Sequence, residues 1–90
     1  MSGTAPYALY VLQCADGTFY AGITTDVVRR VAEHNSSAKG AKYTRTRRPV
    51  RLVYSEAHPS RSAALVAEAA FRQLSRAEKL ARIGRPISGS

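Results

Sequence analysis

A short turn signal between two strand-like segments constrains the fold of this chain more than any other feature. Asp16-Gly17 is a dipeptide that often closes β-hairpins, because glycine tolerates the positive φ that tight turns require. The segments on either side, Tyr7–Cys14 and Thr18–Ile23, are rich in the aromatic and aliphatic residues typical of strands. The sequence therefore predicts that the fold begins with an antiparallel hairpin.

The length of the hairpin loop decides on which face of the sheet its tyrosines lie. A two-residue loop, Asp16-Gly17, would place Tyr10 and Tyr20 on opposite faces, because successive side chains alternate along a strand. A three-residue loop, Ala15–Gly17, with a left-handed glycine at its end, would pair Leu12 with Tyr20 and put both tyrosines on one face. Both loops suit the local sequence, and a joint tyrosine site requires the second.

A helix, a loop and a third strand are predicted after the hairpin. Thr25 or Asp26 can cap a helix that runs to about Ser36, because a short side-chain oxygen accepts hydrogen bonds from the free N–H groups of the first turn. The basic segment Ser37–Pro49 then reads as a loop. Val50–Ala57 is rich in β-formers and is the third strand candidate.

Two more helices complete the predicted fold. Ser60 can cap a helix over Arg61–Leu74, and Ser75 with Glu78 forms a capping box for a last helix that ends near Ile83. The order is therefore β-β-α-β-α-α. It predicts an α+β fold with a small, three-stranded, mainly antiparallel sheet and helices packed on it.

The length and composition of the chain predict one domain inside the cell. Ninety residues can bury only one modest core, which we place at residues 7–83, with flexible ends at 1–6 and 84–90. The chain shows neither a signal peptide nor an apolar run of the roughly 20 residues that span a bilayer. Cys14 is alone, and no Cys/His cluster has zinc spacing. We expect a cytoplasmic monomer or weak homodimer without a membrane partner.

The charge of the chain indicates a nucleic-acid partner. Fourteen basic residues against six acidic ones give a net charge of +8, and eleven of the fourteen are Arg, whose planar guanidinium suits phosphate. A surface kept soluble by charge is the alternative explanation. Much of the basic charge lies in the predicted loop, together with an aromatic ring that could stack on a base. The candidates for nucleic-acid binding there are Lys39, Lys42, Tyr43, Arg45, Arg47 and Arg48.

Three charged or titratable side chains join the tyrosines as candidates for chemistry. Arg30 and His34 are four residues apart, so they share one face of the first predicted helix, at the margin of its apolar stripe. Glu68 lies at the edge of the buried face of the second helix, one turn before Arg72. Each residue alone has a structural explanation, such as sheet packing for a tyrosine or an ion pair with Arg72 for Glu68.

The order and spacing of these residues resemble the GIY-YIG nuclease superfamily. The matching series is Ala8-Leu9-Tyr10, Tyr20-Ala21-Gly22, Arg30 ten residues after Tyr20, His34 four residues further and Glu68 on a later helix. The likeness covers about residues 7–74 and includes the β-β-α-β-α order. In length the chain is similar to the short, stand-alone, single-domain bacterial members.

The resemblance implies a divalent-metal-dependent endonuclease that hydrolyses DNA phosphodiester bonds, with RNA as an open alternative. Glu68 would hold Mg²⁺ or Mn²⁺, and Arg30 would stabilise phosphate charge. Tyr10 or Tyr20 would help to activate water, with His34 near the attacking group. We expect weak sequence preference, because a small domain offers little surface for base readout. Selectivity for DNA structure and a role in repair or recombination are further expectations.

Three positions depart from the family pattern. Ala8 stands where the family usually has Gly, and Ala21 where it usually has a larger aliphatic residue. Ile23 stands where several members carry Lys, so one catalytic cation is missing. The alternative function is a non-catalytic nucleic-acid-binding module on the same fold. The basic segment supports both functions, whereas the full residue series favours the enzyme, because binding alone has no use for a carboxylate facing phosphate.

Overall fold

The computed structural model describes residues 6–84, so the predictions for 1–5 and 85–90 lie outside the described residues. Its centre is a three-stranded antiparallel sheet in the order β2-β1-β3. The predicted hairpin forms β1 (Tyr7–Gln13) and β2 (Phe19–Thr24). The third strand, β3 (Arg51–His58), pairs with the other side of β1. The predicted α+β class and antiparallel sheet are confirmed.

The hairpin has the three-residue loop. The backbone N–H of Cys14 donates to the carbonyl of Thr18 at 2.8 Å, and Gly17 adopts a φ of 86°, in the left-handed region that favours glycine. Leu12 therefore pairs with Tyr20, and Tyr10 with Gly22. The two tyrosines lie on the same face of the sheet, as a joint site requires.

Three of the helices begin at capping residues that the sequence predicts. The helices within residues 6–84 are α1 (Val27–Ser36), α2 (Lys42–Arg45), α3 (Arg61–Arg72) and α4 (Arg76–Ile83). The side chain of Asp26 accepts from the N–H of Arg29 at the start of α1, and Ser60 plays the same part for α3. Ser75 and Glu78 form the predicted capping box of α4.

The helix α2 is the difference from the predicted order. The segment Ser37–Pro49 is not loop throughout, because α2 lies within it. This helix has four residues and no side-chain cap at Ala41, so neither apolar periodicity nor a capping signal marks it in the sequence. It is held by contacts with residues distant in the chain, which a local pattern does not reveal.

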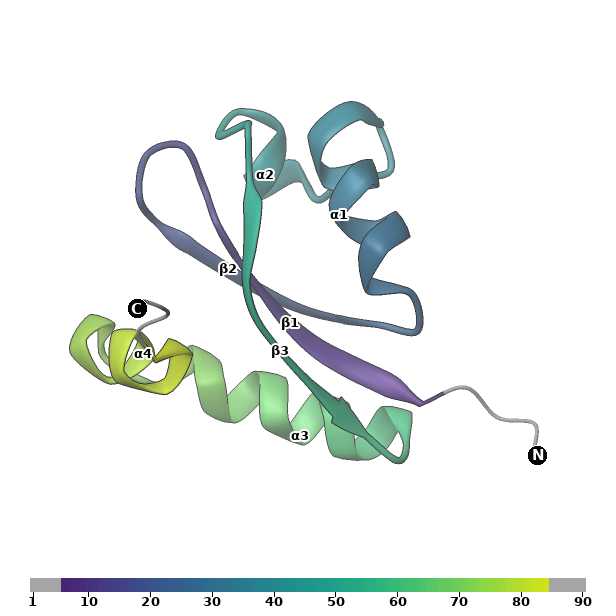
Figure 1. Ribbon diagram of the computed structural model, residues 1–90, viewed down its shortest axis with the longest axis vertical. Helices are drawn as coiled ribbons and strands as arrows, with labels where there is room; N and C mark the ends of the chain where they lie inside the picture. Colours follow the sequence, from purple (N-terminus) through teal and green to yellow (C-terminus); the bar gives the residue numbers. More distant parts are fainter. Residues whose placement is uncertain (1–5, 85–90) are drawn as a thin grey trace.

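The helices cover both faces of the sheet, with α1 and α2 on one side and α3 and α4 on the other (Figure 1). Alternate residues of the central strand β1 therefore enter two cores. The core beneath α3 contains Leu9, Val11, Ala21 and Phe71. The core beneath α1 contains Tyr10, Leu12, Cys14 and Val50, with Tyr20, Val27 and Val31 packed against it. Within residues 6–84, none of the helices has the length and apolar character needed to cross a membrane.

Candidate active site

Tyr10 and His34 form a buried polar pair between β1 and α1. The hydroxyl oxygen of Tyr10 lies 2.8 Å from Nε2 of His34, and the two side chains are 1% and 0% exposed. Burial lowers the pKa of His34 to about 4, and the positive charge of Arg30 adds to this effect. The imidazole is therefore neutral at pH 7, and the pair shares a hydrogen bond without a buried charge.

Gly22 provides the space for the Tyr10 hydroxyl. The two residues are paired across the β1–β2 ladder, and a Cβ atom at position 22 would lie 2.5 Å from the hydroxyl oxygen. Any side chain at this position would have to displace the phenol ring. The two tyrosine motifs are thus linked physically, since the first supplies the phenol and the second supplies the gap that receives it.

Tyr20 connects the buried pair to the surface. Its ring meets the ring of His34 edge-on, with centroids 5.3 Å apart, and stacks on the ring of Tyr43 at 5.9 Å. Tyr43 lies in α2, and the guanidinium of Arg47 stacks over its ring, 3.9 Å from the ring centroid. Because Tyr20 is only half-buried, part of its side chain remains accessible at the surface.

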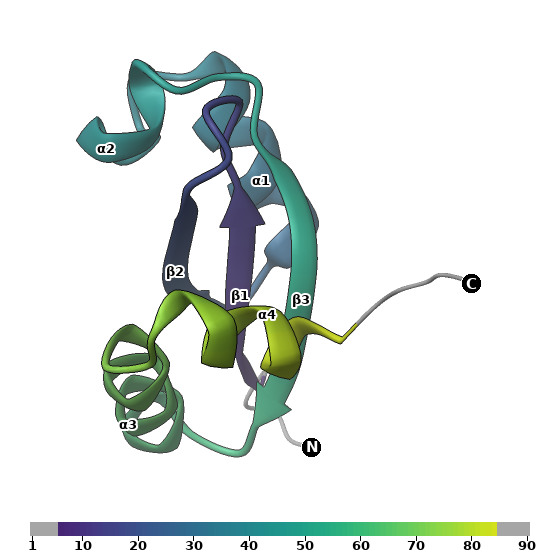
Figure 2. The same cartoon turned by 90° about the vertical axis from the view of Figure 1, so that its left-hand side faces the viewer.

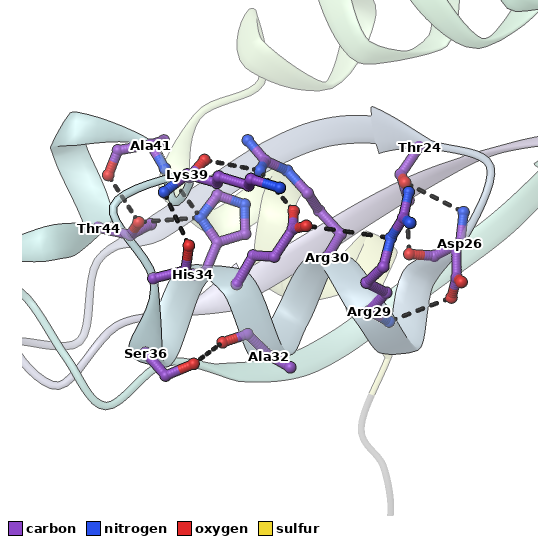
Figure 3. A network of polar contacts seen from close by, with 12 residues as sticks. Thr24, Asp26, Arg29, Arg30, Ala32, His34, Ser36, Lys39, Ala41 and Thr44 are labelled. Atoms are coloured by element: carbon purple, nitrogen blue, oxygen red, sulfur yellow. Dashed lines mark hydrogen bonds and ion pairs between the residues drawn. The ribbon is translucent and has the colours of Figure 1, made fainter.

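Arg30 is oriented by fixed contacts and acts on Tyr10. Its Nη1 donates to Oε1 of Glu33 at 3.0 Å and to the carbonyl of Lys39 at 2.8 Å (Figure 3). Burial raises the pKa of Tyr10, while a hydrogen bond with Arg30 and the positive charge of this guanidinium lower it. Arg30 is thus the cation that favours the ionised form of this phenol.

Glu68 approaches the same phenol from the other layer of the fold. It lies on α3, beneath the sheet, and its side chain is only 16% exposed. Its Oε2 accepts from Nη2 of Arg72 at 3.0 Å, and the same Nη2 lies 3.4 Å from the carbonyl of Ala21 on the edge strand β2. The negative charge of Glu68 is among the groups that raise the pKa of Tyr10. The carboxylate is therefore held by Arg72 beside the edge strand β2, and its charge acts on Tyr10.

The five residues predicted for chemistry come together in the structure. Tyr10 is the common neighbour, since its hydroxyl contacts His34 and its pKa responds to Arg30, Tyr20 and Glu68. They come from both strands of the hairpin and from helices on opposite faces of the sheet. The sequence alone could not show that Glu68 belongs to the layer opposite His34.

The basic segment contains residues that are exposed and residues whose side chains contact other parts of the protein. Lys39, Lys42, Tyr43 and Arg45 are exposed. Arg47 donates to Oδ2 of Asp16 in the hairpin loop at 3.1 Å. Arg48 points inward and donates to the carbonyls of His34 and, at 2.7 Å, of Ser37, both at the end of α1. The basic residues of both groups carry the same charge in the sequence, so only the structure separates the two groups.

Thr44 is a site residue that sequence reasoning missed. It is fully buried, and its Oγ1 lies 2.9 Å from Nδ1 of His34. No signal in the sequence identifies it, because its burial depends on α2, which the sequence does not predict. It contacts the histidine on the ring nitrogen opposite the one that faces Tyr10.

A carboxylate such as Glu68 fits a divalent metal ion whose coordination shell is completed by water and by the phosphate oxygens of a substrate. Within residues 6–84, no group of three or more His, Cys, Asp or Glu side chains could hold a metal ion. A site on Glu68 would therefore need water and phosphate oxygens for most of its ligands. Mg²⁺ is commonly bound in this way, through one or two carboxylates together with substrate phosphates.

Comparison with known proteins agrees with this geometry. The family model described as "GIY-YIG catalytic domain" matches residues 6–81. The UPF0213 protein DP2720 of Desulfotalea psychrophila is 61% identical over 71 residues, which are 79% of this chain and 64% of that protein. The chain thus spans less than two thirds of this relative's length. The UPF0213 protein SAG0778 of Streptococcus agalactiae is 56% identical over 78 residues, covering 87% of this chain and 88% of the relative.

Two solved structures share the fold. The solution NMR structure of the UPF0213 protein BH0048 of Bacillus halodurans superposes with a TM-score of 0.52 at 49% identity, covering 82% of this chain and 78% of that one. The solution NMR structure of protein EF2693 of E. faecalis gives a TM-score of 0.57 at 46% identity, covering 88% and 84%. The resemblance predicted from the sequence is confirmed.

Proposed function

The chain belongs to the GIY-YIG family, and from this premise we propose that it is a divalent-metal-dependent endonuclease that hydrolyses DNA phosphodiester bonds. The observation that carries the proposal is the setting of the Tyr10 hydroxyl, which contacts a neutral histidine and lies within the electrostatic reach of Arg30 and Glu68. Structural packing alone does not require this combination, since a buried tyrosine needs only one hydrogen-bond partner.

Arg30 is the residue that we assign to the phosphate. Its contacts with Glu33 and the Lys39 carbonyl both use Nη1, so further N–H donors of the guanidinium can meet phosphate oxygens. Because these contacts hold the guanidinium before substrate binds, it can stabilise the charge that builds on phosphate in the transition state.

Tyr10 is the residue that we assign to the proton of the attacking water. Its hydroxyl contacts His34, and the positive charge of Arg30 opposes the rise that burial gives to its pKa. A phenol has a reference pKa of about 10 and is further disfavoured here by burial, so Arg30 alone is a weak source of ionisation. A divalent metal bound at Glu68 would supply Lewis acidity to the phosphate and replace the negative field at Tyr10 with a positive one.

The proposed reaction balances its protons through Tyr10 and solvent. The phenol first loses its proton to solvent. A water oxygen then forms a bond to phosphorus, the bond from phosphorus to the leaving oxygen breaks, and the proton of the water passes to the phenolate. The leaving oxygen takes a proton from solvent. Tyr20 packs against His34 and borders the substrate side of this arrangement.

The exposed part of the basic segment is the surface that we assign to the DNA backbone. Lys39, Lys42 and Arg45 are exposed, and a cavity of about 230 Å³ beside β2 is lined by Tyr20, Tyr43, Arg72 and Lys79, among others. Figure 2 shows β2 as the edge strand, with α2 at one end of this edge and α3 at the other. Aromatic rings next to cations suit the bases and phosphates of a strand passing along this edge.

A non-catalytic nucleic-acid-binding module is the second candidate, and one observation favours it. Tyr10 and His34 are almost completely buried, so they could serve only as a hydrogen-bonded part of the core. The exposed cations would then bind nucleic acid without a reaction. The enzyme needs Glu68 for its reaction, whereas the module does not need Glu68 to bind nucleic acid.

The experiment that separates them measures nicking and binding side by side. The protein is incubated with supercoiled and branched DNA, and with RNA of matched sequence, in Mg²⁺ or Mn²⁺, beside Glu68→Ala. We expect metal-dependent nicking of DNA that is lost in Glu68→Ala, with DNA binding retained in both proteins. Binding without nicking in either protein would support the module, and faster cleavage of RNA would correct the substrate.

A further inference from the structure

The imidazole of His34 is enclosed by hydrogen-bond partners on both ring nitrogens. Nε2 lies 2.8 Å from the Tyr10 hydroxyl. On the other side of the ring, Nδ1 lies 2.9 Å from Oγ1 of Thr44 and 3.2 Å from the backbone nitrogen of Ala41 (Figure 3). His34 and Thr44 are both fully buried. In such a site the partners decide which nitrogen carries the proton.

The backbone of Ala41 makes Nδ1 an acceptor. A backbone N–H can only donate, and its direction is fixed by the peptide plane. The N–H of Ala41 donates to Nδ1, which must therefore present its lone pair. Because burial keeps the pKa of His34 near 4, the ring is neutral and carries one proton, which belongs on Nε2.

Thr44 supports the same arrangement. Its hydroxyl proton has two acceptors in reach, Nδ1 of His34 at 2.9 Å and the carbonyl of Ala41 at 2.8 Å. That carbonyl already accepts from the backbone N–H groups of Thr44, at 3.0 Å, and of Arg45, at 3.2 Å. Because Nδ1 presents a lone pair to Ala41, a hydroxyl proton that points to the carbonyl would leave two lone pairs, of Oγ1 and Nδ1, facing each other at 2.9 Å. A hydroxyl proton that points to Nδ1 instead shares this lone pair with the N–H of Ala41 and removes the repulsion.

We propose that Thr44 is a positioning residue that holds His34 in the Nε2–H tautomer, so that His34 donates its hydrogen bond to the oxygen of Tyr10. The opposite tautomer would set the N–H of the ring against the N–H of Ala41, two buried donors facing each other. The short helix α2 thereby supports the site from behind the histidine.

For the proposed nuclease, the direction of this hydrogen bond decides how Tyr10 ionises. An oxygen that accepts from Nε2–H is stabilised as phenolate, and its own proton is free to leave toward solvent. If Tyr10 instead donated to Nε2, loss of the phenol proton to His34 would create a fully buried imidazolium, which Arg30 and Arg48 would disfavour. The consequence for catalysis rests on the proposed function, whereas the tautomer itself does not.

The first test measures the tautomer without any reaction. Nitrogen-15 NMR of the ring nitrogens is recorded at pH 7 on the full chain without metal, because a protonated and an unprotonated ring nitrogen have well-separated shifts. We expect Nε2 of His34 to be protonated and Nδ1 unprotonated. A proton on Nδ1 in the wild type would overturn the proposal, whatever the protein does to DNA.

The second test uses variants of Thr44. Thr44→Val keeps the shape of the side chain but removes the donor, Thr44→Ser restores it, and Thr46→Val changes an exposed threonine two residues away as a matched control. We expect Thr44→Val to give a mixture of tautomers, and Thr44→Ser and Thr46→Val to keep the wild-type signal. An unchanged signal in a folded Thr44→Val would assign the tautomer to Ala41 alone and overturn the role of Thr44.

The nicking assay then connects the tautomer to function. Thr44→Val should lower kcat by about 10–100-fold, the range found when a partner that orients a functional histidine is lost, with KM little changed. The pH dependence of kcat should also shift, because the direction of the hydrogen bond between Tyr10 and His34 changes in this variant. The charged and titratable groups around this pair stay the same; they are Tyr20, Arg30, Glu33, Glu68 and Arg48. Normal kcat and pH profile in Thr44→Val would contradict the catalytic consequence. A wild type that shows the Nε2–H tautomer but does not nick would refute the nuclease instead.

Discussion

The hydroxyl oxygen of Tyr10 lies where a Cβ atom on Gly22 would be only 2.5 Å away, so the phenol occupies the space that the glycine leaves. This relationship explains why both tyrosine motifs matter to one site. The same-face register brings Gly22 opposite Tyr10, and the phenol then extends over β2. The phenol can take this position only because residue 22 has no Cβ atom.

Gly22→Ala should displace Tyr10. The new methyl group would meet the phenol at less than a van der Waals distance, and overpacking of this kind costs about 1–3 kcal/mol. We expect lower stability in urea unfolding and loss of nicking. In a chain that already carries Tyr10→Ala, the Gly22→Ala substitution should cost less stability than in the wild type, because residues in contact are energetically coupled. Additive effects of the two substitutions on the free energy of unfolding would show that the contact is not tight.

The buried neutral state of His34 predicts a dependence of stability on pH. Its pKa falls from 6.5 to about 4 on folding, a difference worth about 3 kcal/mol at about 1.4 kcal/mol per unit. Because the folded pKa is the lower one, this contribution is complete above about pH 6.5 and is lost as the pH falls toward 4. Urea unfolding between pH 7 and 4 should show this loss in the wild type. His34→Gln should have a smaller slope over the same range, and equal slopes would contradict the assignment.

Arg48 should matter more for stability than for binding nucleic acid. Its guanidinium donates to carbonyls at the end of α1, so Arg48→Met would leave buried acceptors without a partner and cost about 1–3 kcal/mol. Lys42→Met removes the same charge from an exposed position and should leave the free energy of unfolding nearly unchanged. Chemical unfolding of the two variants checks this difference. Equal stability would show that Arg48 does not hold the end of α1.

DNA binding should depend on the exposed cations through phosphate contacts. In metal-free buffer, the logarithm of the binding constant should fall linearly with the logarithm of the salt concentration, by about 0.9 per phosphate contact. Replacing Lys39, Lys42 and Arg45 by Gln should reduce this slope by about two to three. A substitution of Arg61, an exposed cation at the start of α3, serves as control and should have little effect. Equal losses of slope per charge would mean that binding uses net charge, with no defined surface.

The sequence predicted the elements that depend on local signals. Asp26, Ser60 and Ser75 cap helices as expected, because a cap is formed within one turn of the chain. The hairpin register was left open, because both loops suited the local sequence. Distant contacts support the three-residue loop, since Ala15 donates to the carbonyl of Arg47, whose side chain in turn holds Asp16.

The sequence suggested the residues of the candidate site but not how the fold arranges them. The spacing of Arg30 and His34 follows from one helix, so their shared face could be read from the sequence. The approach of Glu68 from the opposite layer depends on how α3 crosses beneath the sheet. The inward turn of Arg48 and the burial of Thr44 depend on α2, which has no local signal. These features arise from packing between distant segments.

The initial rate of DNA nicking as a function of Mg²⁺ tests the central claim most directly, in wild type, Glu68→Gln and Glu78→Gln. Both variants lose one carboxylate, but Glu78 belongs to the capping box of α4, where Gln also serves. We predict metal-dependent nicking by the wild type and by Glu78→Gln, and a rate at least about 100-fold lower for Glu68→Gln with intact DNA binding. Nicking by Glu68→Gln at the wild-type rate and with the same Mg²⁺ dependence would contradict the site described here.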